Sequence, residues 1–555
     1  MSIFDIHKLK NSPTWSEFDI SQNKKFSSKI GQILPVAYRT VLPGDKVNLP
    51  ISHFTQTLPL NKNSFARIRE HVDVFFVPFR LLYSKANDIL VNNTDSQVAL
   101  ANSATNNIIP TELPFTTISI LNSAYKFYKA EEASPSYTFK GHDIAGFSRA
   151  ENMKYLCELL GYGDITRGYA DSEGSVDNKA HIPLSMMPIC AYQKIYADFF
   201  RYQQWEDNNP YTYNFDYKIA SNGMQVSLQE ITLPGFGANI YGNGIFDLRY
   251  KNYNKDYYFG LLPSQVNDIY LPKFDMTLDT EKATEEGHFQ RFNDITTTLS
   301  VLQLRASYAL QKWSEIQLFS DKNYKDKIKH HFNVDVPDYT ANQAQYLGGY
   351  SSVMQINDIV NTNLAQANAE RKAIGNSANS GHINFDCKEH GIIMAVYYAL
   401  PLMDYGTLYG YDPEVTHVTA DDFPKPEFDN LGLSPVYLHN LIDVPDNLDK
   451  PIGYAPRYWD FKSCVDKYCG AFNLEQFRGF TIEHPWNLLY DIALSEHPED
   501  LPDIYWMALF KCTPNDAKFI FSALPDSTRL TDTFLTSLDF DFKVNRCLSY
   551  NGMPY

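Results

Sequence analysis

The sequence predicts an all-β core with long loop insertions that carry several α-helices. Short runs rich in Val, Ile, Tyr and Phe recur along the chain, and Gly, Pro, Asn or Asp residues bound them, as is typical of strands. The 555 residues include 38 Tyr and 36 Phe, which favour pleated surfaces and large interfaces. The connections between the runs are long, and such loops need a surface to pack on, for which a neighbouring copy is the simplest candidate.

The chain begins with a polar and slightly basic stretch. We predict an extended N-terminal arm over residues 1–30 and a single domain over residues 31–555. This domain would hold large insertions at about 92–180, 206–256 and 405–450. The arm is where lysines gather, and those that could contact nucleic acid are Lys8, Lys10, Lys24, Lys25 and Lys29.

Two β-rich runs flank the tetrapeptide "LPGD", in which Pro43 and Gly44 fit the second and third positions of a type II turn. The next run is "REHVDVFFVPFRLLY". It alternates at first, with Val72, Val74 and Phe76 on one face, and then becomes apolar on both faces. We expect the second face to be covered by an inserted loop or a neighbouring subunit. Pro78 predicts the end of this strand, because proline cannot donate a ladder hydrogen bond.

Helical periodicity marks four segments. "RAENMKYLCELLGYG" is a helical island within 92–180, and "DKNYKDKIKHHF" predicts a short helix. In "MPICAYQKIYADFFRYQQW" one apolar stripe is formed by Tyr192, Ile195, Tyr196, Phe199 and Tyr202. In "TTLSVLQLRASYALQKWSEIQLFS", just before the short helix, the apolar repeat is Leu302, Ala306, Ala309, Leu310, Trp313 and Ile316.

The C-terminal half adds loops and further strands. "QANAERKAIGNSANSGH" has few large apolar residues and predicts an exposed loop. "GIIMAVYYALP" is apolar on both faces, which is typical of a strand buried on both sides. Beyond it, long irregular stretches alternate with short β runs such as "DAKFIFSALP" and "SLDFDFKVNRCLSY".

Charge and cysteine content limit the partners and the compartment. The net charge of −17 makes the chain a poor nucleic-acid binder by itself, because affinity for phosphate rests on Lys and Arg. Only Cys464 and Cys469 of the seven cysteines are close in sequence, so we expect free thiols in a reducing compartment and neither a metal nor a cofactor. The longest apolar run, 391–403, is too short for a membrane span, and we expect a cytosolic chain without membrane insertion.

No catalytic constellation stands out. His330 and His331 fit a helix end better than a metal site, and Glu389 beside His390 lacks a nucleophile in sequence. A pair of carboxylates for glycoside hydrolysis remains an open possibility, because no spacing in the sequence identifies such a pair. The sequence therefore favours a structural or binding role, without enzyme activity.

Several segments together resemble the major capsid protein of the Microviridae, the small single-stranded-DNA bacteriophages, and in particular its gokushovirus-like and gut-prophage branch. The carrying segments occur in the family's order: "GQILPVAYRTVLPGDKVNL", "HVDVFFVPFRLLY", "LSMMPICAYQKIYADFFRYQQW", "YYFGLLPSQ", "LRASYALQKWSE", "PDYTANQAQYLGGYSS", "EHGIIMAVYYALP" and "YAPRYWDFKS". The likeness runs from about residue 15 to the C-terminus. The family helix usually has Arg where this chain has Cys190, so no role of that arginine is carried over.

The resemblance implies an eight-stranded viral jelly roll with long insertions. Copies would assemble into a T=1 icosahedral shell, a sixty-copy homo-oligomer, around circular single-stranded DNA. The implied partners are a small basic DNA-binding protein, an internal scaffolding protein, a minor pilot protein and the host cell surface. The protein would be assembled in the bacterial host cytoplasm and reside in the virion.

Seven residues are candidates for the core or for assembly contacts: Val74, Phe76, Pro78, Tyr192, Phe199, Trp313 and Tyr458. The alternative from another class is a jelly-roll glycan-binding or glycan-cleaving protein. Such proteins are expected to present surface Trp platforms, and 6 Trp in the whole chain argue against this alternative.

Overall fold

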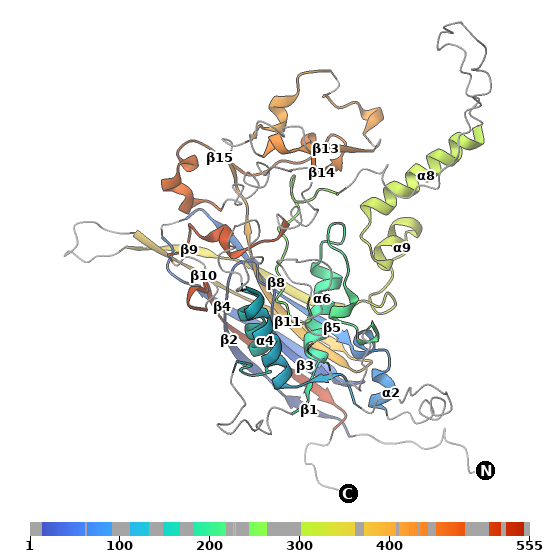
Figure 1. The fold of residues 1–555 in the computed structure, drawn as a ribbon, viewed down its shortest axis with the longest axis vertical. Helices are drawn as coiled ribbons and strands as arrows, with labels where there is room; N and C mark the ends of the chain where they lie inside the picture. The colour runs from blue at the N-terminus through green and yellow to red at the C-terminus, as the bar shows by residue number, and fades with distance from the viewer. Residues whose placement is uncertain are drawn as a thin grey trace, which may run out of the picture.

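A computed structural model gives the fold of the chain (Figure 1). It describes residues 14–61, 64–91, 112–132, 148–166, 182–217, 226, 228, 244–263, 301–360, 371–406, 410–420, 422–429, 432–441, 451–482, 510–522 and 529–548. Two antiparallel sheets make up the larger body, and a separate group of short strands and turns lies at one end of it (Figure 1).

The first sheet contains seven of the described strands. β4 (Lys46–Thr57) lies at its centre, between β10 (Arg371–Asp386) on one side and β16 (Phe534–Phe540) with β17 (Lys543–Arg546) on the other. The outer strands are β2 (Gln22–Ser28) on β16, β1 (Ser16–Asp19) on β17, and β9 (Gln355–Val360) on β10. Alternating burial along β4 shows that this sheet has one face in the core and one toward solvent.

The second sheet contains four described strands in the order β3-β11-β5-β8. Their bounds are β3 (Leu34–Val41), β11 (Gly391–Leu402), β5 (Arg67–Pro78) and β8 (Gln345–Val353). Every residue of β11 up to Pro401 is buried, which confirms the predicted strand covered on both faces. The predicted turn is also confirmed: Gly44 has φ +91°, and the amide of Asp45 donates to the carbonyl of Leu42 at 3.1 Å.

The two sheets pack face to face around an aromatic core. The ring of Phe76 on β5 lies 5.0 Å from that of Phe385 on β10, and Phe26 on β2 meets Tyr397 on β11 at 5.0 Å between ring centroids. These contacts join strands from opposite sheets, so the core is that of a β-sandwich.

The predicted strand that becomes apolar on both faces is β5, and the structure shows what covers its second face. Its second half is buried throughout, and the strand ends at Pro78 as predicted. Phe75 points away from the sandwich core, where its ring lies 4.9 Å from Phe199 and 5.8 Å from Phe200. An inserted helical segment of the same chain therefore covers the outer face of this sheet.

The segment "QANAERKAIGNSANSGH" was predicted as an exposed loop, and this prediction is wrong for residues 371–382, which belong to β10. At Gly381 the backbone of β10 packs closely against the opposite sheet. A Cβ added to Gly381 would lie 2.5 Å from Cδ1 of Tyr350, whose ring stacks on His53 at 5.3 Å. The low apolar content reflects close packing of backbone against aromatic rings.

Replacement of Gly381 by valine should therefore destabilise the sandwich by about 1–3 kcal/mol through overpacking. Urea unfolding of the unassembled subunit measures this loss. Ala378→Val is the matched control, because Ala378 is exposed on the same strand and its substitution should change the unfolding free energy little. Equal stabilities of the two variants would contradict the packing role of Gly381.

The helices lie in the connections between the strands of the two sheets. The described ones are α1 (Phe79–Leu82), α2 (Ala86–Leu90), α4 (Ile118–Glu132), α5 (Arg149–Leu159), α6 (Met187–Ile195), α8 (Val301–Phe319) and α9 (Tyr324–Phe332). Four predicted helices are thus confirmed as α5, α6, α8 and α9, whereas α4 was not predicted. Its helical period is interrupted by Ser and Asn and falls in a segment whose composition suggested loops.

The helix that begins with α6 differs from the prediction in its end and in its burial. It continues as one π-helical turn (Tyr196–Phe200) and stops there, so Tyr202 lies beyond it. Apart from Pro188, every residue of α6 is buried, the polar Gln193 and Lys194 included, which a single apolar stripe does not predict. Gln193 is satisfied by donating to the carbonyls of Ile245 (2.7 Å) and Asp247 (2.9 Å).

Three small antiparallel or parallel pairs complete the described strands: β6 (Phe115–Thr116) with β7 (Leu184–Ser185), β12 (Tyr405–Gly406) with β15 (Lys467–Tyr468), and β13 (Leu433–Tyr437) with β14 (Pro451–Pro456). "SLDFDFKVNRCLSY" supplies β16 and β17 as predicted. "DAKFIFSALP" does not form the predicted β run over its described residues 516–522. These contain the end of a 3-10 helix (Pro514–Ala517), a turn, and one isolated bridge from Phe521 to Leu60. A short apolar run by itself does not indicate whether the segment forms a strand or a turn.

Candidate assembly and binding surfaces

The lysines predicted as nucleic-acid contacts have different environments. Lys8 and Lys10 lie outside the described residues, and the described part of the expected arm is folded as β1 and β2 in the first sheet. Lys29 is only 2% exposed, and its Nζ lies 2.5 Å from Oδ1 of Asp532, so this ammonium is not at the subunit surface. Lys25 is exposed and stays a predicted contact.

The side chain of Lys24 is partly buried. Its Nζ donates to the carbonyl of Leu159 at 2.6 Å, and burial lowers the pKa of the ammonium to about 8. The nearby carboxylate of Glu158 opposes this shift without cancelling it. Lys24 is therefore a partly covered cation at the edge of the first sheet.

The predicted core or assembly residues also separate into two groups. Val74, Phe76, Pro78, Tyr192 and Tyr458 are buried, and Phe199 is half-buried against Phe75. Trp313 is 45% exposed, so it is not part of the core of this chain. Within α8 the structure buries Ser314 and Leu318, whereas Ala309 and Trp313 of the predicted apolar stripe are exposed. The predicted stripe is therefore not the buried face of this helix among the described side chains.

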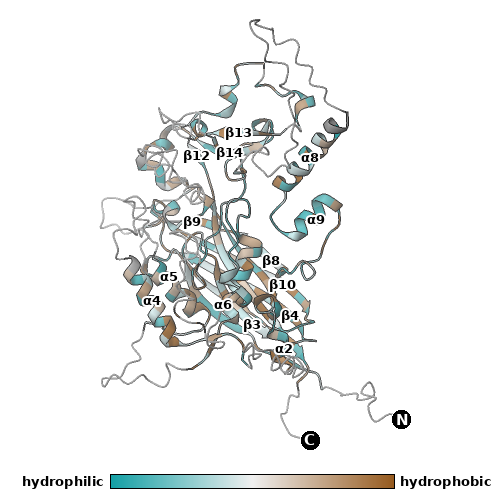
Figure 2. Cartoon of the chain, turned by 45° about the vertical axis from the view of Figure 1, so that its right-hand side comes forward, coloured by the Kyte–Doolittle hydropathy of each residue, from teal (hydrophilic) through white to brown (hydrophobic). Residues whose placement is uncertain are grey.

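The α8–α9 surface is the name we give to the exposed aromatic side chains of Tyr308, Trp313, Phe319, Tyr324 and Phe332. α8 and α9 stand beside the sheets and do not lie on a sheet face (Figures 1 and 2). α9 has no buried residue, although Asn323 caps its N-terminus by accepting from the amide of Asp326. α9 contacts α8 through Lys327, whose Nζ donates to the carbonyl of Gln317 at 2.8 Å. A nine-residue helix without a buried side chain is marginal in water, so the exposed aromatic side chains of this pair are suited to a covering partner.

A buried polar network joins the two sheets. Glu70 on β5 is fully buried, accepts from the hydroxyl of Tyr397 at 2.6 Å, and lies 3.2 Å from Nε2 of His53 on β4. Burial alone would raise the pKa of Glu70, but hydrogen bonds from His53 and Tyr397 outweigh it and hold the pKa below its usual value. The geometry offers no access for a substrate, so the network is structural.

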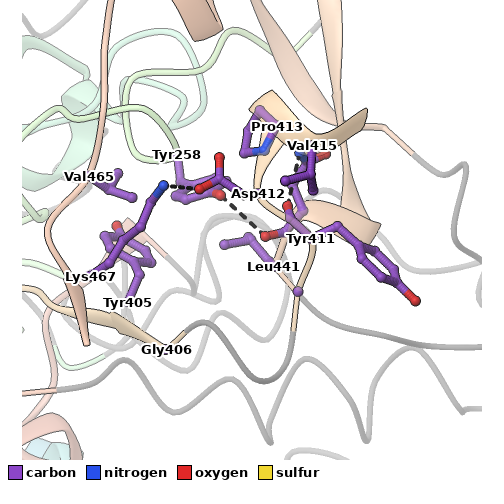
Figure 3. Close-up of a pocket in the computed structure, with 12 residues that line it drawn as sticks. Tyr258, Tyr405, Gly406, Tyr411, Asp412, Pro413, Val415, Leu441, Val465 and Lys467 are labelled. Atoms are coloured by element: carbon purple, nitrogen blue, oxygen red, sulfur yellow. Dashed lines mark hydrogen bonds and ion pairs between the residues drawn. The ribbon is translucent and has the colours of Figure 1, made fainter. Parts of the chain in front are cut away.

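One pocket of about 280 Å³ lies in the group of short strands at the end of the body (Figure 3). Its walls come from four distant segments and include Tyr258, Tyr405, Asp412 and Lys467. Asp412 and Lys467 face each other as an ion pair (Figure 3). The hydroxyl of Tyr405 donates to Asp256 at 2.7 Å. These polar groups hold the walls of the pocket together through their pairing.

Neither a clustered set of metal-ligating side chains nor a helix with the length and apolarity for crossing a bilayer occurs in the described ranges. The features that remain are a rigid β-sandwich and exposed aromatic surfaces on inserted elements. These are the features of a β-sandwich protein whose exposed aromatic side chains are suited to contact with other molecules.

The chain belongs to the capsid protein (F protein) family, whose profile matches residues 9–154 and 163–551. It is a capsid protein of the Microviridae and thus a structural component of a bacteriophage virion. It is also similar to "Capsid protein VP1" of Chlamydia phage 1, with 21% identity over 97% of this chain and 95% of that protein. The glycan-binding or glycan-cleaving alternative gains no support from these relatives.

Proposed function

We propose that this chain is the major capsid protein of its virion and self-assembles into a T=1 icosahedral shell that encloses a circular single-stranded DNA genome. The observation that carries the proposal is the family membership of almost the whole chain together with a rigid sandwich that bears exposed aromatic insertions. The role needs no catalysis, because rigid subunits and complementary surfaces suffice for a closed shell.

We further propose that the sandwich is an eight-stranded jelly roll. The strand count follows if β1 with β2, β8 with β9, and β16 with β17 are each taken as one interrupted strand. The second sheet then holds strands two, seven, four and five, and the first holds strands one, eight, three and six together with the β9 part of strand five. This order supports the proposal, since it is the arrangement produced by two Greek keys folded into two packed sheets.

Two further roles belong to the same proposal. The α8–α9 surface would be buried between copies of the chain, which would cover the aromatic side chains that are exposed in the subunit. The net charge of −17 opposes binding of the DNA phosphates, so additional positive charge is needed. This supports a small basic DNA-binding partner. An internal scaffolding protein, a minor pilot protein, host-surface contact and assembly in the bacterial cytoplasm complete the proposed setting.

Electron microscopy of the purified chain, with and without the other proteins of its genome, tests the proposal. We expect closed particles of uniform size, and a reconstruction should fit sixty copies with the two sheets as described. A chain that stays monomeric under all assembly conditions would contradict the shell.

The aromatic face of α8 gives a mutational test of self-association. Tyr308 is 72% exposed, and Phe319 follows it by three helical turns on the same face. The double variant Tyr308→Ser/Phe319→Ser should keep the fold but lose particles, because buried aromatic anchors contribute about 2 kcal/mol or more each. Sedimentation velocity measures the particle fraction. Lys312→Gln on the same helix is the control, and wild-type particle yield from the double variant would exclude α8 from the contacts.

A further inference from the structure

A row of three side chains crosses the solvent face of the first sheet. Ser537 on β16 pairs with Lys25 on β2 and with Phe54 on β4. Residues directly opposite one another in antiparallel strands point to the same face, so the lysine and the phenylalanine share one surface. Phe54 is 47% exposed and occupies a position where the alternation of β4 otherwise places mostly polar residues.

This row forms the floor of a groove. In the next row, Leu535 pairs with Ser27 on β2 and with Gln56 on β4. The end of α5, at Glu158 and Leu159, makes one wall, and the groove has a volume of about 520 Å³. On the other side, Phe54 pairs with Ala378 of β10, whose methyl group covers little of an aromatic ring.

The charge of the groove differs from that of the chain. Its lining includes two lysines, Lys24 and Lys25, against one acid, Glu158. The chain as a whole has 65 acidic and 48 basic residues. The groove thus has an excess of positive charge on a protein that is acidic overall, and the exposed ring of Phe54 lies in the same groove.

We propose that this groove binds a nucleotide of single-stranded DNA, with the base stacked on Phe54 and the backbone phosphate at Lys25. The inference rests on the proposed function, in which the shell encloses such DNA. Proteins that bind single strands without sequence preference combine aromatic stacking with nearby cations, which is the pair present here. Lys25 and Phe54 are two strands apart, about 10 Å between their backbones, which a lysine side chain and a nucleotide together span.

A nucleotide fits this surface better than a protein partner does. Lysine is depleted at the centres of protein interfaces, where aromatic residues are enriched. Here the exposed ring of Phe54 stands beside Leu535, which is 50% exposed, and the groove also holds Lys25. The polar groups of Ser537, Gln56 and Lys25 can contact a base edge or a phosphate. The site would read no sequence, because stacking and phosphate contact do not depend on the base.

Fluorescence anisotropy of a thymidine oligonucleotide with the purified full-length protein tests the proposal. Phe54→Leu should weaken binding about 5- to 100-fold, since it removes the stacking ring and keeps an apolar side chain. Phe54→Tyr should bind like the wild type. Lys25→Gln should reduce the slope of log affinity against log salt by about 0.7. Phe423→Leu, at an exposed phenylalanine outside the groove, is the control and should have no effect.

Ultraviolet cross-linking of DNA-filled particles, followed by peptide mapping, gives the second readout. A nucleotide adduct on the peptide that contains Phe54 supports the proposal. Wild-type affinity of Phe54→Leu, or a groove filled by a second copy or a scaffolding protein in the particle, overturns it. Filled particles without any adduct in the groove would refute the DNA site alone, whereas failure of the wild-type chain to form shells would refute the proposed function.

Discussion

Replacement of Phe76 by aspartate should prevent the subunit from folding. Phe76 is 1% exposed between the two sheets, opposite Ile393 on β11 and 5.0 Å from the ring of Phe385 on β10. Loss of the ring costs about 3–5 kcal/mol, and an unpaired carboxylate in its place adds several more. Folded domains have only about 5–15 kcal/mol in total, so the two costs together exceed what the subunit can tolerate.

Soluble yield and circular dichroism of the expressed chain measure this outcome. Leu530→Asp is the matched control, because Leu530 is 88% exposed and the same charge should leave folding intact there. Phe76→Leu should fold with reduced stability, since it keeps an apolar side chain in the core. Normal particle yield from Phe76→Asp would show that β5 does not lie in the core.

Substitution of Lys29 by methionine should destabilise the subunit by about 3–5 kcal/mol, because it leaves the carboxylate of Asp532 buried without its cation. Both side chains are almost fully buried, and the ammonium and carboxylate are 2.5 Å apart. Arg529 is 3.8 Å from the same carboxylate and only partly replaces the lost partner. The residue that a basic N-terminal segment suggested as a DNA contact thus has a structural role in the sandwich.

The unfolding free energy in urea separates the two roles. Lys25→Met removes an exposed lysine from β2, four residues before Lys29, and should change stability by less than about 0.5 kcal/mol. The double variant Lys29→Met/Asp532→Leu should recover much of the loss, since no unpaired charge remains. A stable Lys29→Met protein that loses DNA from its particles would instead support the nucleic-acid contact.

The sequence by itself determined the elements whose signals are local. The alternation that turns apolar on both faces predicted β5 and its end at Pro78, and the run at 391–401 predicted β11. The Pro43-Gly44 turn and the helices α5, α6, α8 and α9 follow from dihedral preference and apolar period, which act within a few residues. The family resemblance, carried by eight segments in order, is also a property of the sequence and is confirmed.

Only the tertiary structure decided what each side chain meets. The small residues of β10 suggested a loop because a sequence does not reveal that Tyr350 fills the space above Gly381. Lys25 and Lys29 look alike in the sequence, yet one is exposed and the other is paired with a carboxylate 503 residues away. Phe54 and Lys25 become neighbours through β16, a strand from the opposite end of the chain. Burial and charge pairing depend on such long-range contacts, whereas strand and helix patterns depend on near neighbours, and this difference separates what the sequence predicts from what the fold decides.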